Sequence, residues 1–177
     1  MSTNDSRNVI DKYKGWPHDD IVADLDKNGV ELQIAIENLE RDFNMGTIVR
    51  SANAFGVRTI HIIGRKQWNK RGAMMTDKYL NVIYHKCAAD FIGAMRQDNI
   101  HIVAIDNIQG ATNLSDVRLP SNTVLIFGSE GSGISQELIR LSDEVVAIEQ
   151  LGSTRSLNVG VVAGVVMYQW LRQSMLK

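Results

Sequence analysis

The sequence contains little that would cross-link the chain or anchor it to a membrane. Its 177 residues include one cysteine, Cys87, which excludes an intrachain disulfide and a zinc site built from cysteines. The longest nearly apolar run, residues 159–168, is too short to cross a bilayer. The polar start, residues 1–8, lacks the hydrophobic middle of a secretory signal. We therefore expect a cytoplasmic protein without a membrane partner.

Signatures of common catalytic sites are also missing. The glycines of residues 128–133 have the wrong spacing for a dinucleotide-binding fingerprint, and no lysine follows them as a phosphate-binding loop requires. There is no Gly-x-Ser-x-Gly nucleophile elbow. The four histidines are scattered, and His61 lies inside an apolar stretch, which favours a hydrogen-bonded core residue over a metal ligand. The sequence therefore predicts no metal site.

The charges are unevenly distributed along the chain, although the net charge of −1 gives no overall case for nucleic acid binding. Residues 58–86 carry a net charge of +6, and the remainder carries −7. Trp68, Tyr79 and Tyr84 lie among these cations and offer flat rings on which unpaired bases can stack. Such asymmetry suggests a polyanionic partner. The alternative is a solvated charged face over buried aromatic side chains.

Short β-branched runs alternate with helical patterns along most of the chain. The predicted strands are residues 32–36, 59–63, 100–105, 124–127 and 145–148, with a weaker candidate at 80–84. The predicted helices are residues 46–55, 88–98, 134–141 and 157–173. This alternation predicts an α/β fold with a mainly parallel sheet and helices on both faces.

The first 30 residues follow a different pattern. A turn at residues 16–20 precedes a short acidic helix at residues 21–27, which ends at Asn28-Gly29. We expect residues 1–30 to form a helical appendage docked on a single domain, residues 31–177.

Two segments place polar side chains beside glycines where a predicted strand meets a helix. Asn44 stands at the first such junction, and Arg50 lies about one turn into the following helix, where its guanidinium can meet a phosphate. Residues 127–134 form a glycine-rich loop after a strand, which is where parallel sheets bind ligands. A tight structural turn is the alternative for this loop.

A third segment, residues 148–164, leads into the last helix. Ser156 and Asn158 can cap that helix, whose first amides are otherwise free to bind a ligand. Gly160 and Gly164 are four residues apart and allow another helix or strand to approach closely.

In this order, the three segments resemble the motifs of the SpoU family of RNA ribose 2′-O-methyltransferases, a branch of the SPOUT superfamily. The matching residues are Asn44-x-Gly46-x-Ile48-x-Arg50-x-Ala52-x-Ala54-Phe55-Gly56, Phe127-Gly128-Ser129-Glu130-Gly131-x-Gly133-Ile134 and Gly152-x-x-x-Ser156-Leu157-Asn158-Val159. The resemblance extends over about residues 32–171. It implies methylation of a ribose 2′-hydroxyl in tRNA or rRNA.

The resemblance also implies a fold and a cofactor. The C-terminal part would form a deep trefoil knot, at roughly residues 123–165, against the general rule that chains do not knot. The protein would be a homodimer with both active sites at the shared interface. S-adenosylmethionine would be held mostly by main chain, in a pocket lined by Ile105, Asp106, Gly128, Ile148 and Leu157.

By the same resemblance, catalysis depends on Arg50, which can be supplied across the dimer. This arginine would take the proton of the 2′-hydroxyl, or it would position the ribose and phosphate while a phosphate or water takes the proton. The residues expected to orient Arg50, the ribose and the final loop are Asn44, Glu130, Ser156 and Asn158. The basic segment would grip structured RNA through Arg65, Lys66, Lys70, Arg71 and Lys78.

Two positions depart from the family pattern. Many members have proline after the isoleucine matched by Ile148, where this sequence has Glu149-Gln150. We expect this change to loosen the turn and to place a negative charge near the cofactor. Gly160 stands where serine or alanine often follows the Asn-Val pair.

Two other functions fit parts of the pattern. One is a knotted dimer that binds RNA without methylating it, which would not bind S-adenosylmethionine. The other is a nucleotide-binding α/β protein unrelated to RNA, which would show no salt-sensitive affinity for RNA.

Overall fold

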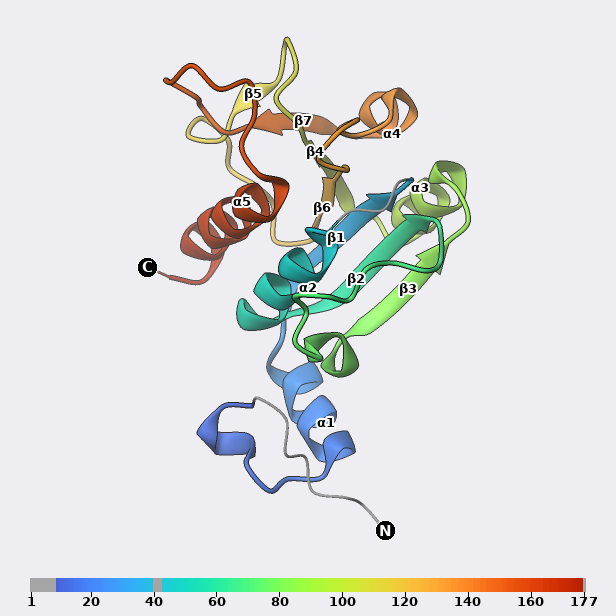
Figure 1. The fold of residues 1–177 in the computed structure, drawn as a ribbon, viewed down its shortest axis with the longest axis vertical. Coiled ribbons are helices and arrows are strands. Elements are labelled where there is room, and N and C mark those ends of the chain that lie inside the picture. Colours follow the sequence, from blue (N-terminus) through green and yellow to red (C-terminus); the bar gives the residue numbers. More distant parts are fainter. Residues whose placement is uncertain (1–8, 40–42, 177) are drawn as a thin grey trace.

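Seven strands form one sheet at the centre of the computed structural model, which describes residues 9–39 and 43–176 (Figure 1). The strands are β1 (Val30–Asn38), β2 (Val57–Gly64), β3 (Asn81–His85), β4 (His101–Ile105), β5 (Thr112–Asn113), β6 (Thr123–Phe127) and β7 (Glu144–Ala147). Their order is β3-β2-β1-β6-β4-β7-β5, and every pairing between them in the described residues is parallel. The predicted parallel sheet is confirmed. The two-residue edge strand β5 was not predicted.

Helices cover both faces of the sheet, as predicted. They are α1 (His18–Asn28), α2 (Met45–Ala54), α3 (Ala88–Gln97), α4 (Gln136–Leu141) and α5 (Val159–Ser174), with short 3-10 helices η1 (Asp11–Tyr13) and η2 (Thr76–Tyr79). One buried cluster joins α2 and α5 to one face of the sheet, and a second joins α3 and α4 to the other. None of the helices in the described residues has the length and apolar character needed to span a bilayer.

Side chains that alternate along each central strand divide the core into these two clusters. In β1, Ile34 and Ile36 pack on the side of α2 and α5, whereas Ala35 packs on the side of α3 and α4. In β6, Leu125 and Phe127 alternate in the same way with their neighbours. Because both faces are covered, the central strands β4 and β6 are apolar in every residue after the first.

Several helices begin at residues other than those predicted, and local hydrogen bonds explain two of the shifts. The last helix begins at Val159 because the Oδ1 of Asn158 accepts hydrogen bonds from the amides of Gly160 and Val161 and caps it. The Oγ of Ser135 accepts a hydrogen bond from Leu138 N, so that α4 begins at Gln136. The first helix begins at His18, directly after Pro17, rather than at residue 21.

The N-terminal helix α1 projects from one end of the sheet (Figure 1). It is attached by an ion pair of 2.8 Å between Asp26 and Arg58, whose side chain is 10% exposed. The Nη2 of the same arginine also donates a hydrogen bond to the carbonyl of Tyr79. Arg58 therefore docks the appendage and does not belong to an open basic surface.

His61 is a core residue, as predicted. It is 2% exposed; its Nδ1 lies 2.9 Å from His85 Nε2 and its Nε2 lies 2.7 Å from Gln33 Oε1. Burial, reinforced by the charge of His85, lowers the pKa of His61 from 6.5 to about 4. The folded protein therefore keeps this ring neutral at pH values where an unfolded chain would protonate it.

The lowered pKa of His61 predicts acid sensitivity. Its contribution to stability is fully present above about pH 6.5 and is lost as the pH falls toward 4, because only the unfolded state gains the proton in that window. Between pH 7.5 and pH 5 we expect a loss of about 2 kcal/mol from this residue. Urea unfolding at both pH values tests this, and the loss should be smaller by that amount in His61→Gln. An equal loss in the variant would contradict the assignment.

Candidate active site

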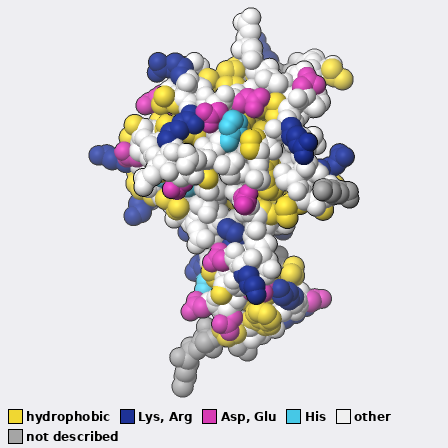
Figure 2. All heavy atoms as spheres, turned by 180° about the vertical axis from the view of Figure 1, so that it is seen from behind, with side chains coloured by type: hydrophobic (Ala, Val, Ile, Leu, Met, Phe, Trp, Pro, Cys, Tyr) yellow, Lys and Arg dark blue, Asp and Glu magenta, His cyan; other side chains and the backbone are white. Residues whose placement is uncertain are grey.

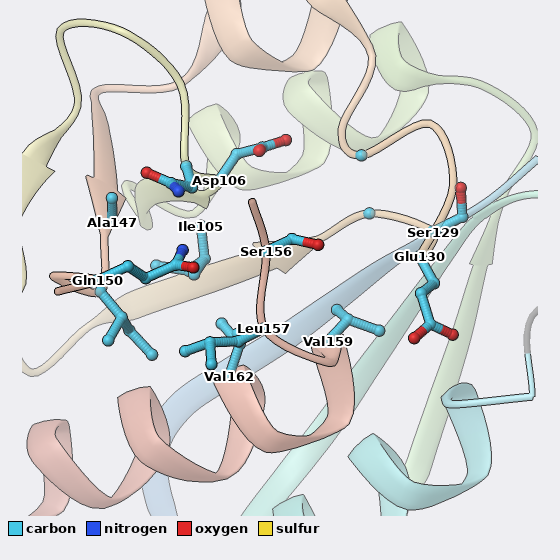
Figure 3. Close-up of a pocket in the computed structure, with 14 residues that line it drawn as sticks. Ile105, Asp106, Ser129, Glu130, Ala147, Gln150, Ser156, Leu157, Val159 and Val162 are labelled. Carbon is cyan, nitrogen blue, oxygen red and sulfur yellow. The ribbon is translucent and has the colours of Figure 1, made fainter. Parts of the chain in front are cut away.

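A pocket of about 110 Å³ lies at the carboxyl ends of β4, β6 and β7, beside the start of α5 (Figure 3). The carboxyl ends of parallel strands share one edge of a sheet, so residues far apart in the sequence meet there. All five residues predicted to bind the cofactor line this pocket: Ile105, Asp106, Gly128, Ile148 and Leu157.

The glycine-rich loop that follows β6 folds back on itself beside the pocket. Ser129 and Gly133 exchange two main-chain hydrogen bonds of 3.2 and 3.0 Å. A Cβ atom on Gly128 would lie 2.1 Å from the carbonyl carbon and oxygen of Gly133. The tight structural turn, which the sequence analysis kept as an alternative for this loop, is therefore present, and it requires glycine at residue 128.

Asp106 connects this loop to β4. Its Oδ2 accepts a hydrogen bond of 3.0 Å from the amide of Ile134, and its side chain would be only 2.7 Å from a Cβ on Gly133. The carboxylate therefore fixes the loop after β4 against the glycine-rich loop while it lines the pocket.

Three of the predicted catalytic residues form one hydrogen-bonded cluster. Asn44 Nδ2 donates to Glu130 Oε2 at 2.8 Å. Asn158 Nδ2 donates to Asn44 Oδ1 at 2.9 Å and to Glu130 Oε1 at 3.1 Å. The cluster joins the starts of α2 and α5 to the glycine-rich loop, and Glu130 also lines the pocket.

Among the residues that the structure describes, no group of histidine, cysteine, aspartate and glutamate side chains is arranged to hold a metal ion. Ser156, the fourth predicted residue on this edge, lines the pocket from the exposed loop before α5.

A model of the SpoU rRNA methylase family matches residues 31–168, which include all three motifs and every segment of the pocket. The chain belongs to this family. The tRNA (guanosine(18)-2′-O)-methyltransferase of Escherichia coli K12 is 25% identical over 146 residues, which cover 81% of this chain and 64% of the relative. This chain thus spans slightly less than two thirds of that protein.

Two solved structures place the fold in the same family. The TrmH/SpoU tRNA modifying enzyme of Aquifex aeolicus has a TM-score of 0.77 and 25% identity, over 88% of this chain and 81% of that one. The SpoU methyltransferase AviRb of Streptomyces viridochromogenes, solved in complex with AdoMet, has a TM-score of 0.70 and 25% identity, over 82% of this chain and 61% of that one.

The arginine of the first SpoU motif does not meet the pocket within one chain. Arg50 is exposed on α2 and is absent from the residues that line the pocket. In residues 9–39 and 43–176 it has no hydrogen-bond or ion-pair partner. A single copy of the chain thus brings together Asn44, Glu130, Ser156 and Asn158 but leaves Arg50 outside.

In the pair that departs from the SpoU pattern, Glu149-Gln150, the two side chains have different surroundings. Glu149 Oε1 accepts a hydrogen bond of 3.1 Å from Ser115 N, and hydrogen bonding to Ser115 lowers the pKa of the Glu149 carboxyl. Glu149 itself does not line the pocket, although both of its neighbours in the chain, Ile148 and Gln150, do.

Gln150, by contrast, lines the pocket, and sequence reasoning missed it. Its Oε1 is buried and has no hydrogen-bond partner among the described residues. A buried acceptor without a donor costs roughly 1–3 kcal/mol, so its presence beside a pocket calls for an explanation. The only sequence signal was its departure from the family pattern.

The predicted RNA-binding residues Arg65, Lys66, Lys70, Arg71 and Lys78 are all exposed. Lys70 nevertheless forms an ion pair, because its Nζ lies 2.6 Å from the buried carboxylate of Asp77.

The aromatic residues among these cations differ in exposure. The expectation about base stacking is wrong for Tyr79, which is 4% exposed, while Trp68 is half-buried against the core. Tyr84 remains 41% exposed. On the face that Figure 2 shows, which is the rear of the view in Figure 1, acidic and basic side chains are interspersed.

The loop of residues 65–75, between β2 and η2, carries four of these cations and is called the basic loop below; it lies directly against the start of α2. Asn38, at the end of β1, donates hydrogen bonds to the carbonyls of Arg65 and Gln67 and so holds the loop at its beginning. Farther along, a Cβ on Gly46 would lie 2.0 Å from the carbonyl oxygen of Arg71. The basic loop is thus placed beside Asn44 and the polar cluster.

This contact predicts opposite effects of alanine at two helical glycines. Gly46→Ala forces the main chain of residues 71–73 away from α2 and should destabilise the protein by roughly 1–3 kcal/mol. Gly93→Ala, in α3, meets no atom within 4 Å and should stabilise the protein by about 0.5–1 kcal/mol. Urea unfolding of both variants measures the difference, and equal effects would refute the close packing at Gly46.

Proposed function

We propose that this protein transfers the methyl group of S-adenosylmethionine to a ribose 2′-hydroxyl of tRNA or rRNA. The observation that carries the proposal is the meeting of the Asn44–Glu130–Asn158 cluster with the pocket on one edge of the sheet. The AdoMet complex of AviRb and the tRNA 2′-O-methyltransferase activity named for the E. coli relative support it.

The composition of the pocket suits this cofactor. Apolar side chains of Ile105, Leu157 and Val162 form one part of the wall, and Ser129 and Glu130 form a polar part (Figure 3). A flat nucleoside and a charged amino acid moiety require these two environments.

When bound, S-adenosylmethionine supplies an electrophilic methyl group. Arg50 either accepts the proton of the ribose hydroxyl or holds the phosphate and the hydroxyl while a phosphate or water accepts it. The polar cluster fixes the start of α5 against the glycine-rich loop, so that Ser156 and Leu157 stay in place beside the ribose. Positioning, more than charge neutralisation, supplies most of the acceleration.

Arg50 reaches this site from a second copy of the chain in a homodimer. Arg50 is exposed and lies outside its own pocket, which supports supply from a partner. Helix α5 offers an apolar face for the contact, since Val161, Val165 and Tyr168 are 56%, 43% and 50% exposed and share one side of the helix. A Cβ atom on Gly164 would meet no atom of its own subunit within 4 Å, so this position allows close approach.

We also propose that roughly residues 123–165 form the trefoil knot. In support, α5 packs on α2, whereas its far end is bonded to a segment that precedes β6: Trp170 Nε1 donates to Pro120 O at 2.9 Å, and Gln173 Nε2 donates to Val117 O at 2.8 Å. The start of α5 is bonded to the glycine-rich loop through Asn158. These contacts of α5 with segments that precede it in the chain are those that a knot would make, and they support the proposal.

The family match begins at residue 31, which supports a methyltransferase domain at residues 31–177 and an appendage at residues 1–30. The exposed cations of the basic loop, beside Asn44, are the proposed grip on structured RNA. We place the protein in the cytoplasm, where tRNA and rRNA are found.

The role of Arg50 is tested by two experiments. Arg50→Lys should abolish methyl transfer, because one ammonium cannot replace the planar guanidinium. A heterodimer of an Arg50→Ala subunit and a Glu130→Ala subunit, isolated with two affinity tags, should retain about half of wild-type activity, since one of its two symmetric sites is complete. An inactive heterodimer would contradict supply of Arg50 from the partner. Near-normal turnover by Arg50→Lys would rule out both proposed roles of the guanidinium.

RNA binding is tested on the cations that have no ion-pair partner in the described residues. Arg65→Glu with Arg71→Glu should weaken affinity for tRNA or rRNA at least tenfold and flatten its salt dependence. Affinity for S-adenosylmethionine, measured by calorimetry, should not change. Lys27→Glu with Arg118→Glu makes the same change in charge elsewhere and serves as the control. Unchanged RNA affinity in the first variant would refute this surface, and a wild-type protein that binds RNA but no S-adenosylmethionine would be a non-catalytic binding module.

A further inference from the structure

The proposed function does not use the side-chain amide of Gln150, which lines the pocket. The side chain extends from the loop after β7 into the pocket, toward Ile105 (Figure 3). Its Oε1 is buried without a hydrogen-bond donor among the described residues. An amide held in this way offers an acceptor and a donor group side by side.

The neighbour of Gln150 is held away from the pocket. The Glu149 carboxylate accepts a hydrogen bond of 3.1 Å from the amide of Ser115, and Glu149 does not line the pocket. The residues around it in the chain, Ala147, Ile148 and Gln150, all line the pocket. The side chain of Gln150 is thus available to a ligand, whereas that of Glu149 is bonded elsewhere.

The surroundings of Gln150 narrow the chemistry of its partner. Four apolar pocket residues lie near it, Ile105, Ala147, Leu157 and Val162, and Asp106 lies beside Ile105 (Figure 3). Ser129 and Glu130 lie at the other end of the pocket. The Asp106 carboxylate would repel a carboxylate of the ligand, whereas a flat, uncharged heterocycle packs against the four apolar side chains.

We propose that the Gln150 side chain recognises the adenine base of the cofactor and makes the site selective for a 6-amino purine. Adenine presents an amino group beside a ring nitrogen, and a glutamine amide pairs with these two groups through two hydrogen bonds. The buried Oε1 then receives its missing donor from the amino group. On the edge of the base that carries N6 and N7, a 6-oxo purine presents two acceptors, O6 and N7, so Oε1 stays without a donor whichever way the amide is turned. The inference rests on the proposed function, since it concerns the same cofactor pocket.

Calorimetry with two ligands tests this assignment without any measurement of activity. The probes are S-adenosylhomocysteine and S-inosylhomocysteine, which differ at the 6-position of the base. The full-length wild-type protein should bind the adenosyl compound at least tenfold more tightly than the inosyl compound. In Gln150→Met, which keeps the length of the side chain but removes both polar groups, this preference should shrink roughly tenfold. Gln97→Met, at an exposed position on α3, is the control and should keep the wild-type preference.

The ratio of the two affinities separates recognition from a structural role. If Gln150→Met weakens both ligands equally, the side chain only supports the loop, and the inference is wrong. The same conclusion follows if the wild-type protein shows no preference. If the wild-type protein binds neither compound, the proposed cofactor is wrong, and the proposed function fails together with this inference.

Discussion

The hydrogen bonds of Asn158 connect the local folding of this chain to its chemistry. Its Oδ1 caps α5, and its Nδ2 reaches Asn44 and Glu130, 114 and 28 residues away in the sequence. One side chain thus fixes where the last helix begins and how the glycine-rich loop lies against it. The pocket exists between these two segments, so its shape depends on this cluster more than on any single wall residue.

The parts of the site that follow from sequence are those set by local rules. Asn158 could be predicted as a helix cap, and Gly128 as part of a tight turn, because both depend on neighbours within a few residues. The alternation of strand and helix patterns likewise predicted a parallel sheet with both faces covered. The positions of Asn44 and Glu130 were predicted through the family resemblance, and the parallel sheet explains why they meet.

The parts that did not follow depend on distant contacts. A count of charges treated Arg58 and Tyr79 as members of a basic, aromatic surface, whereas the appendage and the core bury them. Nothing local to Glu149-Gln150 reveals that the amide of Ser115 draws one side chain out and leaves the other facing the pocket. The place of Arg50 in the site does not follow from one chain, because we propose that this residue enters the pocket of a second copy.

The most direct test of the account is the chemical position of the transferred methyl group. The purified protein would be incubated with total cellular RNA and S-adenosylmethionine that carries a deuterated methyl group, and the RNA would then be digested to nucleosides for mass spectrometry. The account predicts that the label appears on the ribose of a tRNA or rRNA nucleoside, as a 2′-O-methyl group. Label on a base, or no transfer by a protein that binds the cofactor, would contradict it.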